Sequence, residues 1–220
     1  MKRTCVYVDG FNLYYGILAH YRKAYPKDNN SIGVKWLDIN TLVKGLLNES
    51  HEIVKINYFT AEIKSPTVDI DFQQKITRQR LYIRALESNP NTSIIMGCFK
   101  ERQQTFKMPN PPFTKYKYST FSEKGTDINI ATWMLRDAFK SLYDSYVLIS
   151  NDTDLRAPLL LMKNELARNV GIICPQIKMA ESLKDTSNFY RKLDLGDLRK
   201  AQFPDNMTNS KGDFKKPKEW

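Results

Sequence analysis

The sequence predicts an α/β protein whose central sheet is mostly parallel and covered by helices on both faces. Short apolar segments alternate with longer amphipathic segments along most of the chain, which is the pattern of strand–helix–strand units. The 220 residues are 41% hydrophobic and 12% aromatic, which is enough for the sizeable core of one domain. Aspartates directly follow two of the apolar segments, where a parallel sheet gathers ligand-binding residues.

In the first half of the chain, strands are predicted at short β-branched or apolar segments, and helices where apolar residues recur every three to four positions. Asn12 can cap the start of the first helix, and Pro90 ends the third helix because proline cannot extend the hydrogen-bond ladder. The predicted order is strand 3–8, helix 11–21, loop 26–31, helix 37–47, strand 53–60, turn 65–67, helix 68–87 and strand 93–99.

The same patterns continue in the second half of the chain. The predicted order is helix 125–142, strand 146–149, helix 154–167, strand 169–174, a short helix at 179–184 and a weaker pattern over 190–203. From Pro204 onward the chain is polar and charged, which is typical of a terminal segment without a core. We therefore predict a domain over residues 1–203, followed by a basic, disordered tail over residues 204–220.

The chain is strongly basic, with a net charge of +10 and a pI near 9.4. Such a chain attracts polyanions, and nucleic acid is the expected partner because the charge is not concentrated on one membrane-binding amphipathic helix. No stretch approaches the roughly 20 apolar residues that span a bilayer, so we expect no membrane partner. Three widely spaced cysteines predict no disulfide framework, and hence a cytoplasmic protein with reduced thiols.

Four aspartates are candidate metal ligands and catalytic residues. Asp9 ends the first predicted strand, and Asp127 opens a predicted helix. Asp152 and Asp154 follow the predicted strand over residues 146–149. Carboxylates gathered in one crevice raise each other's pKa, and a divalent cation with oxygen ligands relieves that repulsion. Each aspartate alone could instead serve as a helix cap or first-turn residue, but their joint placement favours a metal site.

Other chemistries fit the sequence less well. His20 and His51 lie in ordinary helical and loop contexts, which disfavours histidine acid–base catalysis. The cysteine spacing does not match a zinc site, and neither glycine-rich phosphate-binding motif occurs. A phosphatase would need an Asp-x-Asp pair after the first strand, where this chain has only Asp9.

Three motifs resemble those of NYN domains, a branch of the PIN-like nuclease superfamily. They are residues 8–13 (Val-Asp-Gly-Phe-Asn-Leu), residues 124–127 (Lys-Gly-Thr-Asp) and residues 150–155 (Ser-Asn-Asp-Thr-Asp-Leu). The motifs occur in the order of the family and fall at predicted strand and helix ends. Asn151 stands where the family usually has Gly, and Leu155 where it usually has Phe, and neither change removes a carboxylate.

The resemblance implies a Rossmann-like PIN fold with three α/β/α layers, and RNA cleavage that depends on Mg²⁺ or Mn²⁺. It implies that Asp9, Asp127, Asp152 and Asp154 hold the metal. It also implies that Asn12 and Ser150 support the site through hydrogen bonds to a carboxylate, water or phosphate. Asn12, Ser150 and Asn151 are candidate substrate contacts. Homodimers are common among PIN-like relatives, so a homodimer is compatible with the resemblance.

Basic and aromatic residues alternate over residues 100–123, around a proline-rich break at 109–112. One interpretation is a surface for single-stranded RNA, on which aromatics stack bases and Arg102, Lys115 and Lys117 follow the backbone. The other is an edge hairpin, with a strand over residues 114–121, whose aromatics are buried and whose lysines prevent aggregation. Lys124 has two interpretations as well, a phosphate contact beside Asp127 or a solvated loop residue.

Two functional hypotheses follow from these features. The first is a metal-dependent ribonuclease, in particular an endoribonuclease. The second is a module on the same fold that binds RNA or recruits a protein without cleaving RNA. The four carboxylates favour the first hypothesis, because a module without catalysis has little use for them.

Overall fold

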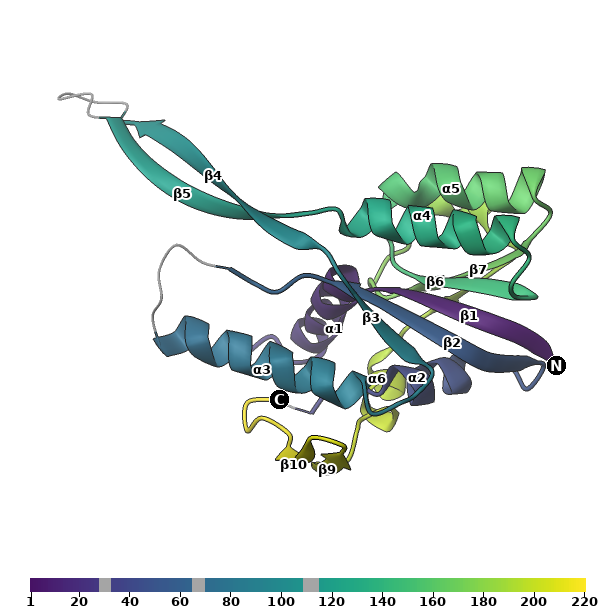
Figure 1. Cartoon of the computed structure of the whole chain (residues 1–220), viewed down its shortest axis with the longest axis horizontal. Coiled ribbons are helices and arrows are strands. Elements are labelled where there is room, and N and C mark those ends of the chain that lie inside the picture. The colour runs from purple at the N-terminus through teal and green to yellow at the C-terminus, as the bar shows by residue number, and fades with distance from the viewer. Residues whose placement is uncertain (28–32, 65–69, 109–114) are drawn as a thin grey trace.

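A computed structural model gives the fold for residues 1–27, 33–64, 70–108 and 115–220. Its central strands are β1 (Lys2–Asp9), β2 (His51–Thr60), β3 (Thr92–Met96), β6 (Ser145–Ile149), β7 (Asn169–Cys174) and β8 (Phe189–Lys192). They form one parallel sheet in the order β3-β2-β1-β6-β7-β8 (Figure 1). The predicted α/β class is confirmed.

The strand order reverses between β1 and β6, which lie side by side in the middle of the sheet. Val8 of β1 stands opposite Ile149 of β6, and Asp9 stands opposite Phe59 of β2. In open parallel sheets, ligands bind at the carboxyl ends of the strands where the order reverses. The segments that follow β1 and β6 therefore meet at the position expected for a site.

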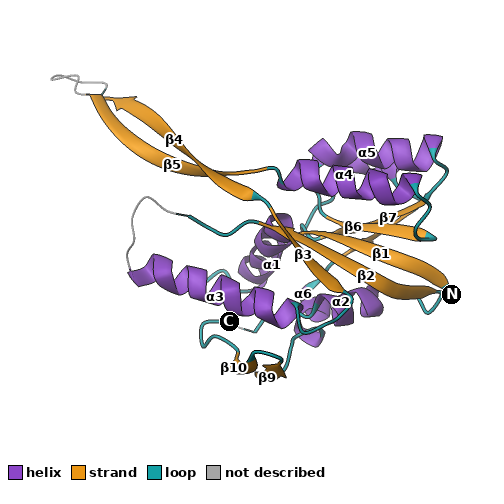
Figure 2. Ribbon diagram, in the orientation of Figure 1, coloured by secondary structure: helices purple, strands orange, loops and turns teal. Residues whose placement is uncertain are grey.

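Helices cover both faces of the sheet (Figure 2). They are α1 (Gly10–Ala24), α2 (Ile39–Leu46), α3 (Ile70–Leu86), α4 (Thr126–Phe139), α5 (Arg156–Leu160) and α6 (Leu195–Lys200). Val6 and Val8 pack in the core with α1, α2, α3 and α6, whereas Cys5 and Tyr7 pack in the core with α4 and α5. Because successive strand residues point to opposite faces, the continuous burial of β1 is that of a strand covered on both sides.

A long hairpin leaves the body of the molecule between β3 and α4 (Figures 1 and 2). Its strands, β4 (Cys98–Lys107) and β5 (Lys115–Lys124), pair antiparallel. The strand predicted over residues 93–99 is thus divided at Gly97, where β3 ends and β4 begins. Phe106 and Tyr116 are 54% and 53% exposed, so the interpretation of this segment as an edge hairpin with buried aromatics is wrong for these residues.

Several predicted features lie wholly or partly outside the described residues. These are the break at residues 109–112, the turn at 65–67, the start of the helix predicted from residue 68, and part of the loop over 26–31. Within the described ranges, the corresponding helix is α3 and the corresponding hairpin arm is β5.

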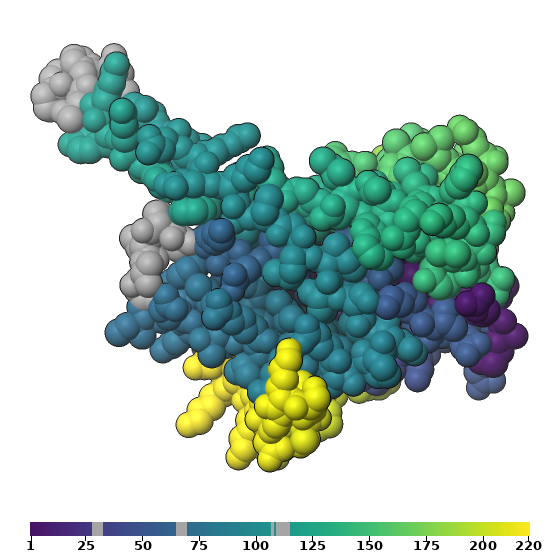
Figure 3. Space-filling view, viewed as in Figure 1, coloured from purple at the N-terminus to yellow at the C-terminus, as the bar shows by residue number. Residues whose placement is uncertain are grey.

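The prediction of a disordered tail over residues 204–220 is wrong. The tail forms a small hairpin of β9 (Asn206–Asn209) and β10 (Gly212–Lys215), seen in yellow against the body in Figure 3. Phe214 and Trp220 are buried, and both rings pack edge-on against Trp36. The Trp36 indole also donates a hydrogen bond to the Pro204 carbonyl at 3.0 Å. The tail is ordered because its two aromatic residues find this distant partner.

The helix predicted over residues 154–167 is instead three short segments. A 3-10 helix η1 (Thr153–Leu155) precedes α5, and a π-helical turn η2 (Leu161–Glu165) follows it. Pro158 explains the irregular start, because it has no backbone N–H to donate to the carbonyl four residues earlier.

Near the end of the domain, the predicted short helix at 179–184 is a 3-10 helix, Glu181–Thr186. The weaker pattern over 190–203 contains most of β8 and all of α6. Across the ranges that the structure describes, no helix is both long and apolar enough to cross a bilayer.

Candidate metal centre

Three aspartates from three separate elements meet at the carboxyl edge of the sheet. Asp9 ends β1, Asp127 lies in the first turn of α4, and Asp152 caps η1. Each offers a carboxylate oxygen within 4.8 Å of the other two, and no other group of this kind occurs among the described residues. The structure thus brings together three of the four predicted ligands.

Asp9 is held from two sides and is only 4% exposed. One carboxylate oxygen accepts a hydrogen bond from the backbone N–H of Asn12 at 3.0 Å, which caps α1. The other accepts from the Ser150 hydroxyl at 2.9 Å. Burial raises the pKa of Asp9, the charge of Asp152 raises it further, and the two hydrogen bonds only partly oppose this. A bound cation would favour the ionised form of this carboxyl.

Ser150 connects two of the candidate ligands. Its hydroxyl donates to Asp9 and also accepts a hydrogen bond from the backbone N–H of Asp152 at 3.1 Å. Its exposed fraction is 0%. Ser150 thus lies beneath the carboxylates of Asp9 and Asp152, and its contact with substrate stays a prediction.

Asn12 and Asn151 tie the loops around the centre together. The side-chain oxygen of Asn12 accepts from the backbone N–H of Asn151 at 3.1 Å. The Asn151 amide in turn donates to the carbonyl of Lys178 at 3.1 Å and accepts from the N–H of Ala180 at 2.8 Å. Both side chains are only partly buried. Direct contact of Asn12 or Asn151 with substrate stays a prediction.

Asp127 lies in an environment that disfavours its charge. Burial, together with the charges of Asp152 and Asp9, raises its pKa to about 6. It is placed by Gly125, which adopts a left-handed φ of 93° between β5 and α4. Since glycine has no side chain to cap α4, the Glu123 carboxylate accepts the Thr126 N–H at 3.0 Å instead.

Glu123 was not among the predicted site residues, although a glutamate three residues before a helix-starting threonine is a usable signal. Gly97 packs against this cap: a Cβ there would lie 2.9 Å from Glu123 Oε1 and 2.9 Å from Thr126 Oγ1. The base of the β4–β5 hairpin is therefore fastened to the start of α4, one residue before Asp127.

Asp154 does not join the cluster of three carboxylates. Its side chain is exposed, and its backbone N–H donates to the Asp152 carboxylate at 2.9 Å. Its charge still contributes to the raised pKa of Asp127, so the carboxylate lies near the centre. A role for Asp154 as a direct ligand stays a prediction.

The donor set suits a hard divalent cation. Mg²⁺ binds oxygen ligands at about 2.1 Å, so ligands on opposite sides lie about 4.2 Å apart. Neighbouring ligands of such an ion lie about 3.0 Å apart. Three oxygens within 4.8 Å of one another are therefore near enough for one ion to draw them together. Three carboxylates without a histidine or thiolate favour Mg²⁺ or Mn²⁺ over zinc.

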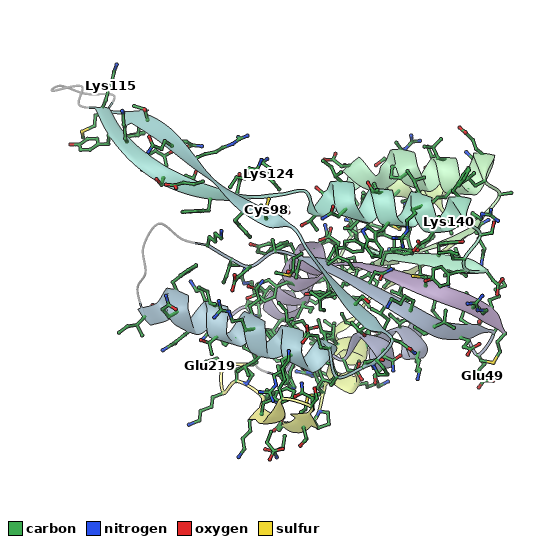
Figure 4. The ribbon with its side chains drawn as sticks, in the orientation of Figure 1. Glu49, Cys98, Lys115, Lys124, Lys140 and Glu219 are labelled. Atoms are coloured by element: carbon green, nitrogen blue, oxygen red, sulfur yellow. The ribbon has the colours of Figure 1, made fainter. Side chains whose placement is uncertain are left out.

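The predicted basic residues lie along the β4–β5 hairpin rather than around the carboxylates. Lys115 stands near the far end of the hairpin and Lys124 at its base, close to the start of α4 (Figure 4). Both are exposed, as are Arg102 and Lys117. The structure thus places Lys124 within the motif that carries Asp127, and the other three farther away.

The two faces of the hairpin carry different side chains toward its outer end. Phe106 pairs with Tyr116, and Tyr118 with Gln104, so these residues share one face with Arg102. Lys115 and Lys117 fall on the opposite face because strand residues alternate. In the outer half of the hairpin, Phe106, Tyr116 and Tyr118 thus form an aromatic face, and Lys115 and Lys117 form a lysine face. Nearer the base the two kinds mix, because Phe99 and Phe121 share the face of these lysines and Lys100 and Lys124 share the face of the aromatics.

Comparison with known proteins agrees with this architecture. The sequence matches the NYN domain over residues 3–194. A 6-hydroxy-3-succinoylpyridine 3-monooxygenase of Pseudomonas putida is 24% identical over 248 residues, which cover 99% of this chain and 75% of that protein. A protein of unknown function from Vibrio parahaemolyticus has a similar fold, with a TM-score of 0.54 at 16% identity, covering 88% of this chain and 94% of that one. Because the match spans most of its length, the chain belongs to the NYN domain family.

Proposed function

We propose that this protein is a metal-dependent ribonuclease, acting as an endoribonuclease on single-stranded RNA. The observation that carries the proposal is the convergence of Asp9, Asp127 and Asp152 within 4.8 Å at the point where the strand order reverses. NYN domains are generally nucleases, which agrees with this use of the carboxylates. Mg²⁺ or Mn²⁺ is the proposed cofactor.

The residues of the centre would have two roles, binding the ion and positioning its ligands. Asp9, Asp127 and Asp152 would hold the ion, and Ser150 fixes the first and last of these through one hydroxyl. When bound, the ion lowers the pKa of a coordinated water and neutralises charge that develops on the phosphate. The raised pKa values of Asp9 and Asp127 mean that these carboxyls gain most from a nearby positive charge.

The hairpin supports RNA as the substrate. Its exposed aromatic face can stack unpaired bases, and stacking of this kind tolerates any sequence. Its lysine face, together with the net charge of +10, favours the phosphate backbone. Since β5 leads directly into α4, RNA bound along the hairpin would approach the carboxylates at Lys124.

The same hairpin also favours a second candidate, a module that binds RNA without cleaving it. Stacking and backbone contacts on β4 and β5 need no metal ion, so binding and cleavage are separable functions. The two candidates differ in what the carboxylates do, and this difference decides the experiment.

The test is cleavage of a labelled pool of single-stranded RNA by purified protein with Mn²⁺, with Mg²⁺ and with EDTA. The key variant is Asp152→Asn, because asparagine can still accept the hydrogen bond from the Asp154 N–H that starts η1. The matched control is Asp144→Asn, which changes an aspartate at the opposite end of β6, where it accepts a hydrogen bond from Arg3.

We expect cleavage by the wild type and by Asp144→Asn that requires metal and is lost in Asp152→Asn. RNA binding without cleavage in every metal, at unchanged affinity in Asp152→Asn, would establish the binding module instead. Cleavage that persists in Asp152→Asn or in EDTA would refute the proposed metal centre.

A further inference from the structure

A pocket of about 490 Å³ opens between α1 and α3, beside the end of β2. Its volume lies in the range of sites for small organic ligands. Gly10 lines the pocket and directly follows Asp9 in the chain. A Cβ on Gly10 would lie 2.7 Å from both the Tyr58 ring and the Phe59 carbonyl. The pocket therefore begins one residue after Asp9 in the chain, and no side chain at position 10 fits beside Tyr58 and Phe59.

Aromatic rings form much of the pocket. Tyr82 packs against Tyr58 and against Trp220, with ring centroids 6.1 and 5.5 Å apart, and these three residues are largely buried. At the mouth, Tyr14 and Tyr15 are exposed and pack edge to face. A planar ring that entered the pocket would find apolar faces at both its floor and its rim.

Positive charge gathers in the same pocket. Among the described residues, Lys35, Lys75 and Arg78 line it, together with the acidic Glu219. The Arg78 guanidinium and the Glu219 carboxylate are 4.0 Å apart, the upper limit for an ion pair, and Glu219 is exposed. Burial lowers the pKa of Lys35, the charges of Arg78 and Arg22 lower it further, and Glu219 opposes them, so the cations repel one another with Glu219 as a partial counter-charge. An anion in the pocket would relieve that repulsion.

We propose that this pocket binds one nucleotide of the RNA, with its base against the tyrosine and tryptophan rings and a phosphate beside Arg78 and Lys35. Neither aromatic walls nor cations alone would select this ligand, but a nucleotide carries both the ring and the anion. The proposal rests on the proposed function, because the bound nucleotide would stand next to the phosphodiester at the metal centre. The pocket thereby becomes the subsite that fixes which bond is cut.

The experiment measures binding of the four ribonucleoside 5′-monophosphates to the full chain in EDTA, by calorimetry and by tryptophan fluorescence. Three comparison ligands each lack part of a nucleotide. Adenosine lacks the phosphate, inorganic phosphate lacks the ring, and nicotinate carries a ring and a negative charge but is not a nucleotide. The variants are Arg78→Gln, which removes the proposed phosphate contact, and Tyr15→Ala, which removes an exposed ring at the mouth. The matched control is Arg80→Gln, since Arg80 lies on the same helix but pairs with Glu62 outside the pocket.

We expect at least one mononucleotide to bind, with affinity about 10-fold weaker in Arg78→Gln and about 5-fold or more weaker in Tyr15→Ala. Arg80→Gln should bind like the wild type. Absence of nucleotide binding would overturn the proposal. So would equal binding of inorganic phosphate, binding of nicotinate in place of nucleotides, or wild-type affinity in both pocket variants.

Asp152→Asn separates this proposal from the proposed function, because nucleotide binding in EDTA does not require the metal centre. If wild type and Asp152→Asn bind the nucleotide equally, and the wild type cleaves no RNA with either metal, the nuclease is refuted and the pocket is kept. Metal-dependent cleavage without any nucleotide binding would refute the pocket and keep the nuclease.

Discussion

The candidate metal centre and the β4–β5 hairpin meet at the start of α4 but are built in opposite ways. The carboxylates of the centre are set at the ends of buried elements, and Asp9 and Ser150 are 4% and 0% exposed. On the hairpin, Tyr116 is 53% exposed, and the strands pair only with each other. One region is fixed by the core of the protein, while the other extends away from it.

The difference suggests a division between chemistry and recognition. A metal site needs its ligands held within a fraction of an ångström, which the core and the Ser150 hydroxyl provide. Binding of single-stranded RNA by stacking tolerates varied geometry and needs exposed rings instead. Substitutions in the centre should therefore abolish cleavage without weakening RNA binding, and substitutions on the hairpin should weaken RNA binding without weakening metal binding.

The largest effect is expected for Asp9→Asn. Asparagine can still accept the Asn12 N–H and cap α1, but it removes the buried charge that would bind the metal. We expect cleavage to fall by at least about 100-fold, because a bound ion contributes several kcal/mol to the transition state. Single-turnover cleavage with Mn²⁺ and calorimetric metal titration are the measurements. Unchanged RNA affinity in a filter-binding assay would complete the contrast, and a parallel loss of affinity would break it.

The next effect concerns the aromatic face of the hairpin. Replacing Phe106 and Tyr116 together by alanine should weaken the affinity for single-stranded RNA by about 30-fold or more, since each stacked base contributes roughly 1–3 kcal/mol and two rings are lost. Calorimetric affinity for Mn²⁺ should not change. Phe139→Ala is the matched control, because this ring at the end of α4 is also exposed, at 78%, but lies away from the hairpin. An equal loss of RNA affinity in the control would contradict a specific role for the hairpin.

A smaller effect is expected for the lysine face. Changing Lys115 and Lys117 to glutamine should lower the slope of log affinity against log salt by about 1.4, since each phosphate contact contributes roughly 0.7 on single strands. The slope is measured by fluorescence anisotropy between about 50 and 300 mM KCl. The control pair is Lys44→Gln with Lys200→Gln, two exposed lysines on α2 and α6. An unchanged slope in the hairpin variant would remove these lysines from the RNA interface.

The smallest effect is a dependence of stability on pH. The pKa of Asp127 is about 6 in the folded protein and lies near its ordinary value of 3.8 when unfolded, so the folded state binds more protons between these values. Without metal, this group therefore makes the protein less stable as the pH rises from about 4 to about 6. Asp127→Asn removes the effect and should be more stable than the wild type at neutral pH, by about 1 kcal/mol after solvent screening.

Thermal melts in EDTA across this pH range test the prediction. The difference in melting temperature between Asp127→Asn and the wild type should be small near pH 4 and should grow toward pH 7. A constant difference would show that Asp127 does not titrate as its surroundings indicate. Added Mn²⁺ should stabilise only the wild type, because metal binding favours the ionised carboxyl.

Much of the fold could be predicted because its signals are local. The buried strands stand out as apolar segments, and the aspartates at their ends follow from the rule that parallel strands present residues at one edge. Asp9 and Asp152 lie together for this reason, and Asp127 joins them from the first turn of α4. Asp154 differs because η1 is a 3-10 helix that leaves its side chain exposed, and Pro158 interrupts the predicted helix.

Other features depend on contacts between distant segments and could not be predicted. The tail is ordered only because Phe214 and Trp220 reach Trp36, some 180 residues earlier in the chain. The pocket beside Gly10 likewise combines α1, α3, the end of β2 and the tail. The exposed state of the hairpin aromatics was undecided as well, because the same sequence pattern fits a buried edge strand and a free arm.

The register of the hairpin has a consequence for where a substrate would be cut. Adding or removing two residues in each strand keeps every side chain on its face, because the alternation has a period of two. Each such step changes the length of the arm by about 6.8 Å, while Gly97, Glu123 and Thr126 keep its base in place. For an RNA bound along the hairpin, insertions in β4 and β5 alone would thus change the distance between the bound nucleotides and the bond to be cut. The carboxylates would stay unchanged.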